Sequence, residues 1–307
     1  MSLLFHTAWE NAEVWRAALR DALDGEAVEP LEGGGEADVA VVWNAPPRAF
    51  AAVPRLKLVC SLGAGVDHLL SLSPVLPGDI RFSRLVDPVM AERMALHVLA
   101  VVLRRHRNLD LFERQQRDRH WRRLFHDDAA DTTVAVLGQG SLGRPVAAAL
   151  AAAGFKVVGW ARSPRTDLSW PVYSGMDGLH EAVAGAAFVV AVLPLTAETR
   201  SILSAPLFAM MRPGAYLVNV GRGEQMVARD LLDALDAGRL SGAALDAFES
   251  EPLPPESPLW SRREILITPH VASLSNPATG ARAIAAEICR FRSEGILRNE
   301  VFCDRQY

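Results

Sequence analysis

The feature that most constrains the fold of this chain is a glycine-rich turn between an apolar run and an alanine-rich run. The apolar run Thr133–Leu137 is a candidate buried strand, and the turn Gly138-Gln139-Gly140-Ser141-Leu142-Gly143 follows it directly. Between a strand and a helix, G-x-G-x-x-G is the pattern of a dinucleotide-binding βαβ unit, whereas the same glycines elsewhere are ordinary turn residues. The N-terminus of the following helix favours a phosphate. All six turn residues are therefore predicted to bind a dinucleotide; the alternative is an ordinary strand–turn–helix junction.

Short apolar runs and helical segments alternate from residue 132 onward, which is typical of a doubly wound parallel sheet. The predicted helices include Leu142–Ala153, Pro206–Met211 and Val227–Ala237. The predicted strands are Thr133–Leu137, Lys156–Trp160, Phe188–Leu193, Tyr216–Val220, Gly242–Leu245 and Ile265–Thr268.

The first hundred residues predict a smaller α/β unit, with the amphipathic segment Trp9–Leu23 between two of its strands. Its predicted strands are Leu3–His6, Val39–Trp43, Leu56–Ser61 and Arg81–Leu85. A long apolar helix over Ala91–Arg105 leads out of this unit, and a helix over Pro277–Arg292 is long enough to return to it. We therefore predict an α/β fold in which a Rossmann cofactor domain, residues 99–276, is inserted into a flavodoxin-like substrate domain, residues 1–98 and 277–307.

The composition excludes several classes of partner. The net charge of −4 gives no general attraction to nucleic acid or anionic lipid. The longest apolar stretches are well short of the ~18–20 residues of a membrane span. The three cysteines lack metal-ligand spacing, and Met1–Trp9 does not have the pattern of a signal peptide. We therefore expect no metal, no nucleic acid and no membrane, and a cytoplasmic location.

One basic segment departs from this balance. Residues 104–123 hold eight arginines and three acidic residues. A nucleic-acid patch is one interpretation, and a solvated helix with a connecting arm that helps subunits associate is the other; we favour the second. Met90 and Glu92, at the start of the long apolar helix, are expected to be packing or interface residues.

The end of the second strand of the cofactor domain predicts which dinucleotide is used. NAD enzymes usually carry an Asp or Glu about 20 residues after the glycine turn, where it binds the ribose 2′-hydroxyl. This sequence has Ala161 there, followed by Arg162, Ser163 and Arg165. A guanidinium binds a 2′-phosphate well, and a carboxylate would repel it. We predict that these four residues favour NADPH over NADH; the alternative is that the arginines are only solvated loop residues.

Three polar residues follow later strands of the same sheet, where ligands bind in open α/β folds. They are Arg222, Glu251 and His270. An arginine can bind a carboxylate and a carbonyl oxygen, and an imidazole, which ordinarily titrates near pH ~6.5, can protonate an alkoxide. A carboxylate beside the imidazole stabilises the protonated ring and orients it. Each residue alone has an ordinary structural explanation, but the three together predict reduction of a 2-oxo acid by hydride transfer.

Motifs along the whole chain support this prediction. The sequence resembles the D-isomer-specific 2-hydroxyacid dehydrogenases, and most of all their bacterial glyoxylate/hydroxypyruvate reductase A branch. The resemblance rests, besides the glycine turn, on Trp43-Asn44-Ala45-Pro46, Leu62-Gly63-Ala64-Gly65-Val66-Asp67, Leu193-Pro194-Leu195-Thr196, Gly221-Arg222-Gly223, Asp246 with Glu251-Pro252-Leu253-Pro254, Pro258-Leu259-Trp260, Thr268-Pro269-His270-Val271-Ala272 and Asp304-Arg305-Gln306-Tyr307.

The resemblance implies roles for particular residues. Arg222, Glu251 and His270 would be catalytic, with Arg222 and His270 also contacting the substrate. The loop Ala64-Gly65-Val66 would bind the substrate carboxylate through backbone N–H groups. Trp43 would line the substrate pocket or, alternatively, be a core tryptophan. Leu193, Pro194 and Thr199 would line the cofactor cleft, and Asp246 would contact the nicotinamide carboxamide.

The resemblance also implies an assembly and a reaction. It implies a homodimer joined mainly through the cofactor domains, and reduction of glyoxylate to glycolate and of hydroxypyruvate to D-glycerate. Two departures from the branch are Val220-Gly221, where it tends to have Leu-Ala, and Asn44, where it has a histidine. The alternatives are a reductase of a bulkier 2-oxo acid and a non-catalytic dinucleotide-sensing protein of corepressor type.

Overall fold

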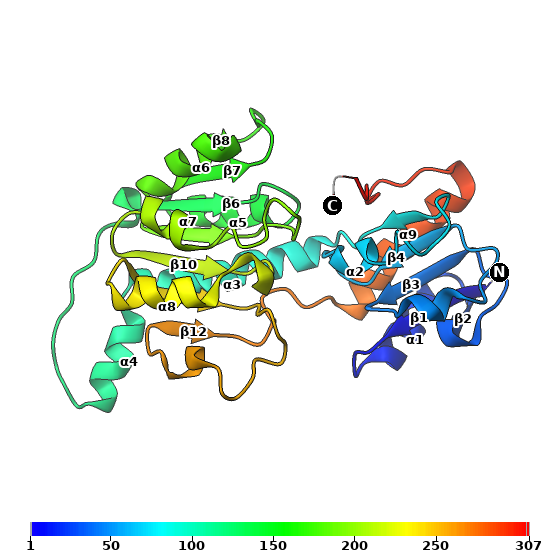
Figure 1. Ribbon diagram of the computed structural model, residues 1–307, viewed down its shortest axis with the longest axis horizontal. Helices are drawn as coiled ribbons and strands as arrows, with labels where there is room; N and C mark the ends of the chain where they lie inside the picture. The colour runs from blue at the N-terminus through cyan, green and yellow to red at the C-terminus, as the bar shows by residue number, and fades with distance from the viewer. Residues whose placement is uncertain (1, 305, 307) are drawn as a thin grey trace. The chain divides into compact units, whose positions relative to one another are not determined.

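The computed structural model describes residues 2–304 and 306, and it divides into two compact units (Figure 1). Unit 2 runs from Ala91 to Leu274, and unit 1 contains the residues on either side of it. The crossings thus follow Met90 and Leu274, whereas the sequence predicts them after residues 98 and 276. The first difference arises because α3 (Pro88–His106) is one continuous helix, so its apolar pattern has no break at the crossing. Arg305 and Tyr307, part of the terminal motif, lie outside the described residues.

Unit 1 is built on a sheet with the strand order β2-β1-β3-β4-β5, which is the flavodoxin-like order. Neighbouring strands of this sheet run parallel. The strands are β1 (Ser2–Thr7), β2 (Ala27–Pro30), β3 (Val39–Trp43), β4 (Leu58–Ser61) and β5 (Arg81–Ser83). The helices are α1 (Ala12–Ala22), α2 (Asp67–Leu70) and α9 (Pro277–Glu294), with 3₁₀ turns at η1 (Leu31–Gly33) and η2 (Pro47–Phe50).

The core of unit 1 follows from the alternation of side chains along its strands. Leu4, Ala40, Val42 and Val59 face a cluster that η1, η2 and α2 complete. Helices α1 and α9 pack on each other. A Cβ at Gly280 of α9 would overlap the Trp15 ring of α1. Glycine therefore sets the spacing of these two helices.

Unit 2 contains the larger sheet, with the strand order β12-β11-β10-β9-β6-β7-β8. All of its strand pairs are parallel, and the order is that of a Rossmann fold extended by one strand. The strands are β6 (Thr133–Leu137), β7 (Lys156–Ala161), β8 (Val172–Ser174), β9 (Phe188–Ala191), β10 (Ala215–Asn219), β11 (Leu240–Leu245) and β12 (Ile265–Ile267). Besides α3, the helices and 3₁₀ turns are α4 (Leu109–Arg117), η3 (Ala129–Asp131), α5 (Gly143–Ala152), α6 (Gly175–Ala184), α7 (Ala205–Met210), η4 (Gly223–Gln225), α8 (Ala228–Asp236) and η5 (Pro258–Ser261).

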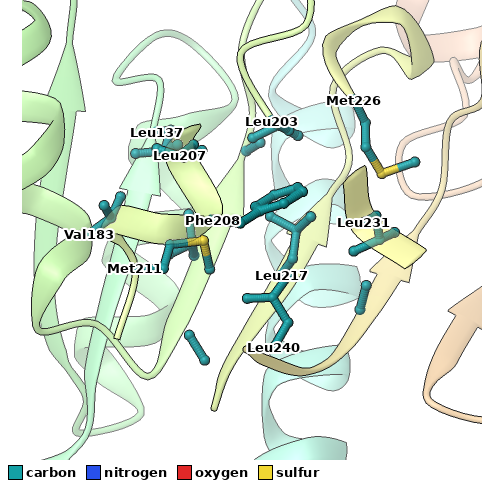
Figure 2. Packing of buried hydrophobic residues seen from close by; sticks show 14 of the residues in the cluster. Leu137, Val183, Leu203, Leu207, Phe208, Met211, Leu217, Met226, Leu231 and Leu240 are labelled. Atoms are coloured by element: carbon teal, nitrogen blue, oxygen red, sulfur yellow. The ribbon is translucent and has the colours of Figure 1, made fainter. Parts of the chain in front are cut away.

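Both faces of the large sheet are buried, which explains the continuous apolar runs of its strands. On one face, side chains of α6, α7 and α8 pack against the strands; Figure 2 shows Phe208 among the leucines of this cluster. On the other face, α3 and α5 pack against residues such as Val134 and Val136 of β6. The sheet therefore holds its strand ends in fixed positions, and the loops that follow them carry the candidate site.

The predicted α/β class with a Rossmann domain is confirmed, and most elements lie within a few residues of their predicted bounds. The sequence missed β2, β8, α2 and α6. In β2 only Val28 is buried, and β8 is three residues long, so neither carries a readable periodicity. Within the described residues, no helix is long and apolar enough to cross a membrane. Cys60, Cys289 and Cys303 are free thiols.

Candidate active site

The glycine turn of unit 2 shows why each glycine is there. Gly138 has a φ of 103°, and its N–H donates to the carbonyl of Trp160 at 2.8 Å. A Cβ at Gly138 would overlap the carbonyl of Val192, and one at Gly143 would overlap the carbonyl of Gly138. A Cβ at Gly140 would meet no atom within 4 Å. The first and third glycines therefore allow the backbone to pack, while the second leaves open space in which a pyrophosphate can approach the backbone.

The side chain of Gln139, within the turn, is buried and bonded inside unit 2. Its Nε2 donates to the carbonyl of Val136 at 2.9 Å, and its Oε1 accepts from Trp170 Nε1 at 3.0 Å. Its carbonyl accepts from Arg144 Nε at 3.1 Å. The group of Gln139 that remains to bind a dinucleotide is therefore its backbone N–H.

The loop after β7 carries the residues predicted to bind a 2′-phosphate. Ala161 ends the strand, and Arg162, Ser163 and Arg165 are exposed in the loop. A further arginine that the sequence analysis missed is close to this loop: Arg144, in the first turn of α5, pairs with Asp167 at 3.0 Å. The loop is thus rich in guanidinium groups, and its one carboxylate, Asp167, is already paired with a cation.

Thr199 and Gln225 hold the segment after β9 that contains Leu193 and Pro194. Thr199 Oγ1 donates to the carbonyl of Pro194 at 2.6 Å. The Gln225 Nε2 donates to the carbonyls of Leu193 and Pro194 at 3.2 and 2.8 Å. The side chain of Thr199, which the sequence predicts near the cofactor, is thus directed at its own loop.

Arg222 lies just beyond β10, and two buried amides hold its backbone. Asn219 Oδ1 accepts from the N–H of Gly221 at 3.1 Å, and Asn219 Nδ2 donates to the carbonyl of Arg222 at 3.1 Å. Gln225 Oε1 accepts from the N–H of Arg222 at 2.9 Å. Sequence reasoning missed Asn219 and Gln225; their signal was a polar residue at the end of a buried strand and another three residues after the arginine.

Two loops meet at Gly223. A Cβ there would overlap the backbone of Phe248 and Glu249, so only glycine lets the Arg222 loop pack against the loop after β11. In that second loop, the N–H of Phe248 donates to Glu251 Oε1 at 2.9 Å. Glu251 is therefore held by the same backbone that the Arg222 loop packs against.

Glu251 and His270 form the central pair of the site. His270 Nδ1 donates to Glu251 Oε2 at 2.8 Å, and the two side chains are 41% and 38% exposed. Burial acts to raise the pKa of Glu251, but the hydrogen bonds from His270 and Phe248 and the positive charge of Arg222 outweigh it. The pKa of this carboxyl is consequently below its usual value, so Glu251 carries its charge at neutral pH.

Asp246 organises the backbone around His270. His270 has a φ of 53°, and its N–H donates to the carbonyl of Asp246 at 2.8 Å. The buried carboxylate of Asp246 accepts from Thr268 Oγ1 at 2.6 Å and from the N–H groups of Val271 and Ala272, both at 2.9 Å. The left-handed conformation of His270 is thus stabilised by hydrogen bonds to Asp246 from the residues before and after it.

The arrangement can hold and deliver a proton. Because Nδ1 of His270 is bonded to Glu251, the other ring nitrogen, Nε2, is the one that can face a substrate. A proton carried on Nε2 can be donated to that substrate. Arg222 lies near enough to Glu251 for its charge to act on that carboxyl. A cation and a proton donor together suit a carbonyl that becomes an alkoxide.

The residues predicted to bind the substrate carboxylate lie in unit 1, between β4 and α2. The N–H groups of Ala64, Gly65 and Val66 donate to no acceptor within residues 2–304 and 306. Trp43, at the end of β3, is half-buried, and its ring occupies the space where a Cβ of Gly63 would be. The loop thus offers backbone donors beside an aromatic ring.

Fold and site define a two-unit oxidoreductase with a dinucleotide-binding domain. The NAD binding domain of the D-isomer specific 2-hydroxyacid dehydrogenases matches residues 99–272, and the chain belongs to this NAD(P)-dependent family. Glyoxylate/hydroxypyruvate reductase A of Serratia proteamaculans is 38% identical over 294 residues, 94% of each chain.

Two solved structures extend the comparison over the full length. A D-isomer specific 2-hydroxyacid dehydrogenase from Xanthobacter autotrophicus, in complex with NADPH and MES, has a TM-score of 0.94 and 39% identity, covering 100% of this chain and 99% of the other. An NADPH-dependent glyoxylate/hydroxypyruvate reductase from Sinorhizobium meliloti, in complex with NADP and sulfate, has a TM-score of 0.92 and 38% identity, covering 100% of both chains.

Proposed function

We propose that this enzyme uses NADPH to reduce small 2-oxo acids, with glyoxylate and hydroxypyruvate as its substrates. The observation that carries the proposal is the 2.8 Å bond between His270 Nδ1 and Glu251 Oε2, in a loop cluster that also holds Arg222. The names of the curated relatives and of the Sinorhizobium structure support the same substrates.

Each residue of the cluster has a proposed role in the reaction. Bound NADPH supplies the hydride. Arg222 binds the substrate's carboxylate and carbonyl oxygen, which stabilises the charge that develops on that oxygen. His270 Nε2 gives its proton to the oxygen, and Glu251 stabilises the protonated ring. Asp246 fixes the His270 loop and, through its remaining acceptor positions, contacts the nicotinamide carboxamide.

The backbone N–H groups of Ala64, Gly65 and Val66 bind the substrate carboxylate, with Trp43 lining the pocket. Three backbone N–H donors in succession suit an anion and bind it without the bulk of a polar side chain.

A screen of NADPH oxidation against glyoxylate, hydroxypyruvate, pyruvate and bulkier 2-oxo acids tests the substrate assignment. We expect the two small acids to give the highest kcat/KM. Turnover of only bulky acids would contradict the assignment, and no turnover with any of them would contradict the enzyme role. In the same assay, His270→Gln should lower kcat by roughly 10²–10⁴-fold with NADPH affinity unchanged, because it removes the acid and nothing that binds the dinucleotide.

The preference for NADPH is proposed from the loop after β7. Arg162 and Arg165 are exposed there, no carboxylate ends the strand, and Gly140 leaves space for the pyrophosphate. The complexes of the Xanthobacter and Sinorhizobium proteins with NADPH and NADP support it. Replacing both arginines by alanine should raise KM for NADPH but not for NADH, while Arg229→Ala, at an exposed position of α8, should change neither. A wild-type enzyme that prefers NADH would refute the proposal.

We also propose a homodimer formed through unit 2. Trp121 and Phe125, in the irregular segment after α4, are 94% and 93% exposed, which is rare for aromatic residues of a monomer. The double variant Trp121→Ala/Phe125→Ala should sediment as a monomer at concentrations where the wild type is a dimer. Met176→Ala, an exposed apolar residue on α6, is the control. A wild type that is monomeric at all concentrations would refute the proposal. The cytoplasmic location stays a prediction.

A further inference from the structure

A buried histidine in unit 1 connects the two segments assigned to the substrate. His68, on α2, is 8% exposed, and its Nε2 lies 2.9 Å from Ser61 Oγ. Its Nδ1 lies 3.4 Å from the N–H of Asn44. We propose that His68 is a positioning residue that holds the loop Gly63–Val66 and the Trp43-Asn44 segment in one arrangement. This inference rests on the proposed function, because it assigns His68 to the recognition of the substrate acid.

The directions of the hydrogen bonds follow from the groups involved. The Asn44 N–H can only donate, so Nδ1 of His68 accepts and its Nε2–H donates to Ser61 Oγ. The Ser61 hydroxyl donates in turn to the carbonyl of Gly65 at 3.2 Å, and its oxygen accepts from the N–H of Gly63 at 3.1 Å. Every donor in this series of hydrogen bonds meets an acceptor only when the His68 ring is neutral with its proton on Nε2.

Ser61 fixes both ends of the turn that presents the backbone donors. It is fully buried, so none of the three hydrogen bonds of its hydroxyl is exchanged freely with water. Gly63 and Gly65 flank Ala64, and both are bonded to the one hydroxyl. The positions of the Ala64, Gly65 and Val66 N–H groups therefore depend on where His68 holds Ser61.

His68 also fixes the aromatic side of the pocket. The rings of Trp43 and His68 lie 4.6 Å apart, and Trp9 packs on Trp43 with a ring separation of 5.1 Å. Asn44 has a φ of 52°, a left-handed conformation that its bond to His68 helps to hold. The donors that bind the acid and the ring that limits its size are thus set by one side chain.

Steady-state kinetics of the full-length enzyme test the proposal. His68→Leu should raise KM for glyoxylate and Ki for oxalate, an unreactive dicarboxylate, roughly tenfold each, as expected for the loss of a buried hydrogen-bond connection. Its kcat should stay within about threefold, and KM for NADPH should not change, because the catalytic residues of unit 2 are untouched. His68→Gln, which can still donate to Ser61, should recover part of the loss.

A second variant tests the same hydrogen-bond connection, and a control variant tests a hydroxyl outside it. Ser61→Ala should give the same rise in KM and Ki, and the double variant His68→Leu/Ser61→Ala should be no worse than the more affected single variant, because both remove one connection. Ser71→Ala removes a hydroxyl that bonds the carbonyl of His68 but does not touch the loop, and it should behave as the wild type.

The outcomes separate this proposal from the proposed function. If the wild type reduces 2-oxo acids and folded His68→Leu and Ser61→Ala variants keep KM and Ki within twofold, His68 is a packing residue and the proposal fails alone. If His68→Leu does not fold, Ser61→Ala and His68→Gln decide. If the wild type reduces no 2-oxo acid, the proposed function fails, and oxalate binding by calorimetry to wild type and Ser61→Ala still tests the loop.

Discussion

Replacing Glu251 by glutamine tests the centre of the site without changing its shape. The carboxylate accepts two hydrogen bonds, one at Oε1 from the N–H of Phe248 and one at Oε2 from His270 Nδ1. A glutamine side chain has one oxygen and one NH₂ group, so it can accept only one of them. Either the backbone contact or the donation from Nδ1 is lost, and in both cases the negative charge that stabilises the protonated ring is gone.

The size of the effect follows from the exposure of the pair. A hydrogen bond to a charged group contributes about 1.5–3 kcal/mol when shielded, and an exposed ion pair contributes about 0–1 kcal/mol. At 41% and 38% exposure, the His270–Glu251 pair lies between these cases, at about 1.5 kcal/mol. That energy corresponds to a fall in kcat/KM of about tenfold.

The assay is reduction of glyoxylate by NADPH at pH 7, with the dissociation constant for NADPH measured separately. We expect Glu251→Gln to lower kcat/KM about tenfold and to leave NADPH binding unchanged. Glu249→Gln makes the same charge change at an exposed position two residues away and is the matched control. A Glu251→Gln enzyme with kcat/KM within twofold of wild type would refute the proposed role of Glu251.

The same substitution has a signature in stability. The pKa of Glu251 is lower in the folded protein than its usual value, because hydrogen bonds and nearby positive charge outweigh the opposing effect of burial. A group of this kind stabilises the fold above its unfolded pKa, about 4.3 for Glu, and that contribution is lost as the pH falls through the folded-state pKa. The Tm difference between wild type and Glu251→Gln should therefore be largest near neutral pH and vanish in acid. A difference that does not depend on pH would contradict this account.

Four further substitutions follow from the geometry of unit 2. Gly140→Ala should fold with a wild-type Tm but bind NADPH at least about tenfold more weakly, whereas Gly143→Ala should lower Tm because its Cβ overlaps backbone; thermal melts with and without NADPH distinguish them. Gln225→Ala should raise KM for the 2-oxo acid and lower kcat, since it frees the backbone of the Arg222 loop; unchanged kinetics in a folded variant would count against its positioning role. Asp246→Asn should lower kcat by about tenfold or more, because an amide oxygen and NH₂ group cannot accept all three bonds that hold the His270 loop; a wild-type kcat would show that the loop keeps its conformation without them.

The parts of the fold that the sequence predicted are those with a local signal. The Gly138–Gly143 turn needs particular backbone angles and close approaches, and these requirements are visible in six consecutive residues. Strands buried on both faces, such as β6 and β9, appear as short apolar runs. Two of the four edge strands, β2 and β8, lack this signal, because they bury little and carry no alternation that can be read.

The site shows the same division between local and distant information. Arg222, Glu251 and His270 could be chosen as candidates because each follows a strand of one sheet. The contacts of Asn219 and Gln225 could not be predicted, since a buried amide in a sequence does not reveal which backbone groups it bonds. His68 was missed for a related reason: its bond to Asn44 joins residues 24 positions apart that only the fold brings together.

The close packing at Gly223 has a consequence for how the substrate range of this enzyme can be changed. There is no space for even a methyl group between that glycine and the Phe248–Glu249 backbone. The Arg222 loop and the loop after β11 are therefore packed too tightly to move independently. Redesign aimed at either loop would have to rebuild both together. Asn44, by contrast, is exposed and follows a strand end in unit 1. Its φ of 52° and the bond from its N–H to His68 restrict the replacements to residues that tolerate a left-handed backbone, such as Asp, His and Gly. Within that set, Asn44 is the natural starting point for libraries that seek new 2-oxo acids.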